Sequence, residues 1–200
     1  PWDGIDVVSL GASIVTAFNQ IAARQINVTS SPTVLTVATI HGGVRNNIIP
    51  EELKMSGTMR TFTDERRTDV IARMEKTVQN LAESYGATAT LTMNSPSYPV
   101  TYNDPDLAKA MLPTLTKAAG GAKNVESEGD LVTGSEDFSF YARKIPGVFY
   151  QLGGRKPSID AKSAPANHSP YFDIDESVLE VGVRTHVLLA LDYLASRKGK

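Results

Sequence analysis

The sequence contains no cysteine, so neither a disulfide nor a thiolate metal ligand can form within this chain. No apolar run approaches the roughly 18 residues that a membrane-spanning helix needs. Charge of one sign is not in excess either, because 20 Lys and Arg nearly balance 22 Asp and Glu. This balance leaves no basic surface for nucleic acid or for an anionic membrane, and we expect neither as a partner.

What is present is enough for a folded core, since 41% of the 200 residues are hydrophobic, an ordinary share for one large or two small domains. The chain opens with Pro1 and Trp2, without an initiator methionine and without a signal-peptide pattern. We therefore expect it to be a fragment or a cleaved product of a longer protein.

The first half of the chain alternates between helical and strand periodicity. Apolar residues recur at helical spacing after Asp6, the expected N-cap, at Val7, Leu10, Ile14, Phe18 and Ile21. Residues 33–40 are rich in Val, Thr and Ile and predict a strand that leads into His41 and two glycines. From Leu53 to Arg60 apolar and polar side chains alternate, which predicts a second strand with one buried face.

A second helix is expected next, closed by Gly86 and with an apolar stripe of Ile71, Met74, Val78, Leu81 and Tyr85. Alternation over residues 87–93 then predicts a third strand. These elements indicate an α+β domain in which two helices cover one face of an antiparallel sheet. A split βαβ arrangement would need one more strand before the first helix, and this chain does not contain it.

A proline-rich stretch, residues 95–99, predicts a linker to the second half. That half should contain a helix near residues 104–119, a short helix around residues 138–141 and an apolar strand at 147–152. The last helix is expected to start at Asp173 or Asp175, with Asp173 and Glu176 as a capping box, and to reach about Ser196.

The most distinctive polar motif is the run Asn-His-Ser-Pro-Tyr-Phe at residues 167–172, which lies just before the last helix. A rigid loop can hold a neutral imidazole such as that of His168 toward a metal ion. The alternative is a loop histidine whose ring is hydrogen-bonded to backbone, and the motif alone leaves both open.

Two adjacent carboxylates, Glu136 and Asp137, lie where the short helix begins. Capping of the helix N-terminus is the simpler interpretation, because the helix dipole favours acidic groups there. In the functional alternative a carboxylate orients a metal ligand, or backbone N–H groups bind a substrate carboxylate.

Three polar residues near the predicted hairpin are further candidates. His41 lies in a Gly-rich turn, Asn47 shortly precedes a proline, and Arg60 falls on the polar face of its strand. A guanidinium fork suits a carboxylate substrate, although a solvated charge on the sheet face is the ordinary alternative for Arg60.

Together these motifs resemble the M20 amidohydrolases, and they do so in order along essentially the whole chain. Residues 41–43, Asn47, Pro50 and residues 57–60 are similar to the lid or dimerisation domain of that family. Residues 103–104, 136–138 and 168–172 are similar to motifs of its C-terminal part. The subgroup that the chain looks most like hydrolyses N-acyl amino acids such as hippurate and auxin–amino acid conjugates.

The resemblance implies that residues 1–98 form most of a lid domain and residues 99–200 the C-terminal portion of an α/β zinc-peptidase-like catalytic domain. The family's site holds two divalent ions, commonly zinc, manganese or cobalt. Its ligands include a Cys and a His in an early motif, a Glu beside the general base, a His just before the lid, and a late His. Only the late His maps onto this chain, at His168, so we expect the ions in the full-length enzyme and none bound by residues 1–200 alone.

The implied reaction is metal-assisted hydrolysis of an amide bond in an N-acyl amino acid or a small peptide. By resemblance, His41 stabilises the tetrahedral oxyanion in the partner subunit's site, Asn47 and Arg60 bind the substrate amide and carboxylate, and Glu136 supports a metal ligand. A homodimer through the lid is implied as well. The competing interpretation is a non-catalytic dimerisation or interaction module, which would need neither the motif at His168 nor the one at Glu136. An RNA-binding sheet would need exposed aromatics and a basic face, whereas the polar strand faces carry mostly Thr and Ser.

Overall fold

The computed structural model describes residues 2–94 and 97–197, so part of the predicted linker, Ser95 and Pro96, lies outside the described residues. The described chain forms two compact units. One consists of the residues up to Val100 together with Thr133–Ser135, and the other of Thr101–Val132 together with the residues from Glu136 onward. Within the described ranges, no helix has the length and apolar character needed to cross a membrane.

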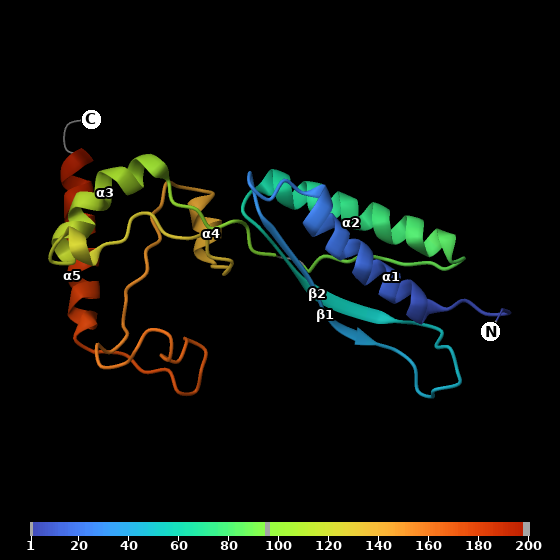
Figure 1. Cartoon of the computed structure of the whole chain (residues 1–200). Helices are drawn as coiled ribbons and strands as arrows, with labels where there is room; N and C mark the ends of the chain where they lie inside the picture. The colour runs from blue at the N-terminus through green and yellow to red at the C-terminus, as the bar shows by residue number, and fades with distance from the viewer. Residues whose placement is uncertain (1, 95–96, 198–200) are drawn as a thin grey trace. The chain divides into compact units, whose positions relative to one another are not determined.

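The first unit has two helices on one face of a two-stranded antiparallel sheet, as Figure 1 shows. The elements are α1 (Val7–Gln20), a π-helical turn η1 (Ile21–Gln25), β1 (Thr33–His41), β2 (Lys54–Thr61) and α2 (Asp64–Ser84). The predicted arrangement of helices on one sheet face is therefore confirmed, with fewer strands than expected.

The first helix follows the prediction closely. Asp6 is its N-cap and accepts hydrogen bonds from the backbone N–H groups of Val8 and Ser9, both at 3.0 Å. The bonds from the Ser9 side chain and backbone hold the pKa of the Asp6 carboxyl below its usual range. The buried side chains of the predicted stripe are Leu10, Ile14, Phe18 and Ile21.

The second helix begins at its N-cap Thr63, whose hydroxyl accepts from the Arg66 N–H at 3.1 Å. Its core-facing residues are Val70, Met74, Val78 and Ala82, so only two residues of the predicted stripe are buried. The prediction that Tyr85 belongs to the core is wrong, because this residue is the C-cap and its side chain is exposed. The predicted stop at Gly86 is confirmed by its φ of +71°, a backbone conformation that glycine adopts without strain.

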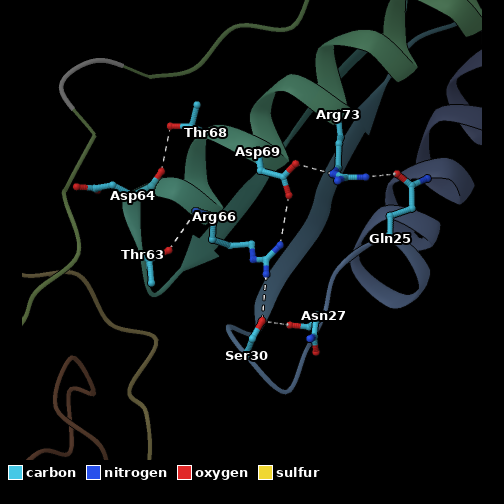
Figure 2. A network of polar contacts seen from close by, with 9 residues as sticks. All are labelled: Gln25, Asn27, Ser30, Thr63, Asp64, Arg66, Thr68, Asp69 and Arg73. Carbon is cyan, nitrogen blue, oxygen red and sulfur yellow. Dashed lines mark hydrogen bonds and ion pairs between the residues drawn. The ribbon is translucent and has the colours of Figure 1, made fainter.

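A polar network ties the start of α2 to the segment that precedes β1 (Figure 2). The Asp69 carboxylate accepts from Arg73 at 2.8 Å and from Arg66 at 3.3 Å. Arg66 also donates to the Ser30 hydroxyl and Arg73 to the Gln25 side chain, each at 3.4 Å. One carboxylate thus holds two guanidinium groups against the turn that leads into the sheet.

The hairpin register pairs Thr33 with Thr61 at one end and His41 with Lys54 at the other. An irregularity between Val37 and Thr39 interrupts the ladder. Gly57 sits opposite this point, and a Cβ there would lie 1.9 Å from the Thr36 carbonyl oxygen. Only glycine permits this close approach of the two backbones.

The third predicted strand is wrong. Residues 87–93 are extended and alternate in burial, and Ala87, Ala89 and Leu91 pack against the core, yet they pair with neither β1 nor β2. The alternating burial agrees with the local pattern, but a strand also requires a neighbour at hydrogen-bonding distance, and none of the described residues supplies one.

The second unit is built on two packed helices, α3 (Pro105–Ala118) and α5 (Val178–Arg197), with the short elements η2 (Ala122–Asn124) and α4 (Phe138–Ala142). Asp104 caps α3 by accepting from the Leu107 N–H at 2.8 Å, and positive φ angles at Gly120 and Gly121 follow the helix end. The helices expected near 104–119 and 138–141 are confirmed.

Two predictions for this unit are wrong. No strand is present at 147–152 or elsewhere in the described part of the unit; instead the Asn103 side chain pairs with both backbone groups of Phe149, at 2.9 and 2.6 Å. The last helix starts at Val178, three residues after the later of the two expected starts, and the Asp173 carboxylate pairs with Lys156 and does not cap the helix. Asp175 accepts instead from the Ser177 N–H, at 3.0 Å.

Candidate functional site

His168 has an unusual backbone conformation. Its φ is +71°, the only positive φ of a non-glycine residue within residues 2–94 and 97–197. The left-handed region costs an L-residue about 1–2 kcal/mol, and such strain persists only where the surrounding structure enforces it. The enforcing contacts are local: the Ser169 N–H donates to the Ala166 carbonyl at 3.1 Å, and the Tyr171 N–H donates to the Ser169 hydroxyl at 3.2 Å.

The imidazole of His168 is exposed and accepts or donates no hydrogen bond among the described residues. The structure therefore does not show the alternative, a loop histidine whose ring is hydrogen-bonded to the backbone. The loop is fixed by neighbouring backbone and hydroxyl groups, and the ring nitrogens are free to bind a ligand.

Glu136 precedes α4, but its side chain does not cap that helix. Its carbonyl oxygen accepts from the Ser139 N–H at 3.1 Å and from the Ser139 hydroxyl at 2.6 Å. Asp137, the N-cap residue, makes no side-chain capping bond either. Both carboxylates are exposed, so the capping role that was the simpler expectation is wrong.

His41 is the last residue of β1 and is exposed, and Asn47 lies in the loop that joins β1 to β2. That loop, residues 42–50, lines a shallow open depression together with Asp6 and Val8 at the start of α1. The backbone geometry agrees with a turn after His41, because Gly43 has a φ of +80°.

Arg60 is half-buried and lies near the opposite end of the hairpin, paired with Val34. Since Val34 and His41 are seven residues apart on one strand, Arg60 and His41 are separated by about 20 Å along the sheet. The Arg60 guanidinium donates to the Thr133 carbonyl oxygen, within the same unit. It is thus a bound group and not the freely solvated charge that was the ordinary alternative.

The five predicted site residues fall into two groups. His41, Asn47 and Arg60 belong to the first unit, and Glu136 and His168 to the second. In the part of the chain that the structure describes, no three His, Cys, Asp or Glu residues come close enough to hold a metal ion. Among the described residues, His168 is therefore an exposed imidazole outside any such cluster.

Sequence reasoning missed two contacts around these residues. Arg60 and Thr133 are 73 positions apart, and Asn103 and Phe149 are 46 apart. Nothing in the local pattern of either pair predicts the other member, although Asn103 was already part of a recognised motif.

The comparisons with known proteins agree on one family. The model of peptidase family M20/M25/M40 matches residues 6–192. Thermostable carboxypeptidase 2 of Saccharolobus solfataricus is 34% identical over 193 residues, 96% of this chain and 47% of that protein. IAA-amino acid hydrolase ILR1-like 2 of Arabidopsis thaliana is 32% identical over 201 residues, 100% of this chain and 44% of that protein.

A solved structure supports the same assignment. The Bacillus subtilis YXEP protein, described as a dinuclear metal binding peptidase from the M20 family, matches with a TM-score of 0.74 and 27% identity. The match covers 96% of this chain and 46% of that one, and the chain likewise spans about half the length of the curated relatives it matches. Since the family model and relatives above 30% identity cover nearly all of it, the chain belongs to peptidase family M20/M25/M40.

Proposed function

We propose that this chain is part of a metal-dependent amidohydrolase that cleaves the amide bond of N-acyl amino acids or small peptides. Family membership supports a hydrolase, and the names of the relatives, a carboxypeptidase and an amino acid hydrolase, support the substrate class. The observation that carries the proposal is His168, an exposed imidazole held in a strained left-handed conformation within a family motif. Strain of this kind is typical of functional positions.

His168 is proposed as one ligand of a site with two divalent ions, of which zinc, manganese and cobalt are the candidates. When bound, such ions lower the pKa of a coordinated water and polarise the scissile carbonyl. The hydrogen bonds within residues 166–171 would hold the backbone of His168 in place and leave its ring nitrogens available to a metal ion. Glu136 has an exposed carboxylate and is the candidate that accepts a hydrogen bond from a metal-ligating side chain and so orients it.

The hairpin geometry supports separate duties for Arg60 and His41. A separation of about 20 Å along the sheet exceeds the length of a small N-acyl amino acid, so one substrate cannot touch both residues of one copy. We propose that Arg60 binds the substrate carboxylate, Asn47 binds the amide, and His41 stabilises the oxyanion in the site of a second copy. A homodimer through the lid is the assembly that makes this possible, and the outer edge of β1 offers backbone groups for it.

The second unit has features of a part of a larger catalytic domain. The apolar side chains Leu179, Val183, Val187, Leu191 and Leu194 of α5 are exposed, on faces that α3 does not cover. A helix that is apolar on several sides is typical of a buried position between two layers. The exposed stripe therefore supports residues 99–200 as the C-terminal portion of an α/β catalytic domain, and residues 1–98 as its lid.

The proposal predicts that residues 1–200 alone have no amidase activity, because one imidazole is too few for a catalytic ion that usually needs about three protein ligands. The test is to purify this chain, add zinc or manganese, and assay hippurate and other N-acyl amino acids. Turnover comparable to that of an intact family member would show that the active site has been misplaced. Metal binding by the longer protein distinguishes this proposal from a non-catalytic module, because such a module needs no metal ion.

A further inference from the structure

The two faces of the β1–β2 hairpin carry different side chains. One face lies against the helices (Figure 1), and Leu53 and Met55 belong to it. A Cβ at Gly11 of α1 would meet the Leu53 side chain at 2.1 Å and the Met55 sulfur at 3.7 Å. Because side chains alternate along a strand, the residues between them in β2 point away from the helices, onto what we call the outer face. These residues are Lys54, Ser56, Thr58 and Arg60.

The alternation in β1 changes halfway along the strand. Val37 packs against the core, and in a regular strand every second residue after it would face the core as well, Thr39 and His41 included. Instead the hydroxyls of Thr39 and Ser56 share a hydrogen bond of 2.6 Å, which puts Thr39 on the outer face. His41 is directly opposite Lys54, so it lies on the outer face too.

One extra residue in β1, Ala38, causes this change. Its neighbours Val37 and Thr39 are opposite Gly57 and Ser56, so β1 advances two residues where β2 advances one. Such an insertion is a β-bulge, and bulges redirect the side chains that follow them. A change of register by one residue moves every later side chain to the other face. Without the bulge, the last residue of β1 would therefore point toward α1.

We propose that this β-bulge is a positioning device, which turns His41 onto the outer face of the sheet, the face that also carries Arg60. Ala38 supplies the extra residue, and Gly57 supplies the space for it. A Cβ at Gly57 would lie 1.9 Å from the Thr36 carbonyl oxygen, and a backbone atom cannot move aside as a flexible side chain can. The assignment of the face rests on the register alone, whereas its importance for turnover rests on the role proposed above for His41.

The first experiment reads the face of β1 without using activity. The chain has no cysteine, so Thr39→Cys and Ser56→Cys can be introduced together and oxidised without competing thiols. We expect a disulfide in this pair and none in the control pair of Ile40→Cys and Ser56→Cys, whose side chains leave the sheet on opposite faces. Adding Gly57→Ala should expel the bulge and slow the first disulfide at least about tenfold, because the two thiols then lie on different faces. A disulfide that forms as fast with Gly57→Ala as without it would overturn the proposal.

The second experiment measures turnover in the full-length protein. Gly57→Ala should lower kcat about as much as His41→Ala does, roughly 100-fold, the usual loss when one oxyanion donor is removed. The matched control is Thr58→Ala, an exposed position on the next residue of the same strand, which should change kcat little. A kcat for Gly57→Ala close to that of the control would overturn the proposal.

A compensating deletion separates positioning from simple damage to the sheet. Deleting Ala38 in the Gly57→Ala variant restores a regular ladder, which has room for the new Cβ and again places His41 opposite Lys54. The kcat of this double variant should return to within about tenfold of the natural protein, against the roughly 100-fold loss expected for a misplaced donor. A value no higher than that of His41→Ala would overturn the proposal, even if Gly57→Ala alone does not fold. Unchanged turnover in His41→Ala would instead overturn the role proposed for this imidazole, and the disulfides would still decide whether the bulge sets its face.

Discussion

The backbone strain at His168 predicts that Gly is more stabilising than Ala at this position, the reverse of the usual order. At an ordinary position Ala is favoured over Gly by about 0.4–1 kcal/mol, since Gly has more conformational freedom in the unfolded chain. At a φ of +71° the side-chain Cβ adds a cost of about 1–2 kcal/mol that Gly does not bear. The order should therefore invert, with His168→Gly more stable than His168→Ala by about 1 kcal/mol.

The assay is urea unfolding of both variants, followed by far-UV circular dichroism, which reports on α3 and α5 of the same unit. The matched pair is Ser169→Gly and Ser169→Ala at the next residue, whose φ is not positive. Both Ser169 variants lose the bond from the Tyr171 N–H equally, so Ala should there be at least as stable as Gly. If His168→Ala is as stable as His168→Gly, the loop relaxes freely, and no backbone strain remains to support a functional role for His168.

Two further predictions concern the first unit. In the full-length protein, Arg60→Ala should raise KM for substrates with a free carboxylate roughly 10- to 100-fold. The lost bond to the Thr133 carbonyl should lower the unfolding free energy by only about 1 kcal/mol. The control is Lys54→Ala, which removes an exposed charge from the same strand. A large drop in thermal stability with unchanged kinetics would make Arg60 purely structural. Ile21→Ala should lower the unfolding free energy by about 3–4 kcal/mol, because its side chain is 0% exposed in the core. The same change at Ile48, which is 52% exposed, should cost less than about 1 kcal/mol, and equal losses in urea titrations would mean that the core is misidentified.

The elements that the sequence predicts well are those specified by local chemistry. Helix α1 combines an Asp N-cap with apolar residues at helical spacing. Helix α3 is capped by Asp104 and is followed by two glycines with positive φ. Each of these features acts within a few residues of the helix end. The same holds for the turn after His41 and for the stop at Gly86.

The failures depend on partners that are distant in the chain. The alternation at residues 87–93 is real, but strand formation requires an adjacent backbone that the described residues do not provide. Asp173 looks like a cap, yet Lys156, seventeen residues earlier, engages its carboxylate. The Lys156 side chain also lowers the pKa of Asp173, which keeps this ion pair charged. The strand pattern alone did not show whether the Arg60 guanidinium is solvated or bound. Its hydrogen-bond acceptor, the Thr133 carbonyl oxygen, lies 73 residues away in the sequence.

The proposed function depends most directly on His168 as a metal ligand in the full-length protein. The measurement is the divalent metal content of that protein, with hippurate hydrolysis assayed on the same samples, for the natural sequence, His168→Ala and Ser169→Ala. We predict that His168→Ala loses bound metal and nearly all turnover, because a metal site with one ligand removed cannot hold its ion in place. The Ser169→Ala variant keeps the imidazole but loses one bond that holds its loop, so it should retain much more metal and turnover than His168→Ala. Unchanged metal content and turnover in His168→Ala would contradict the account.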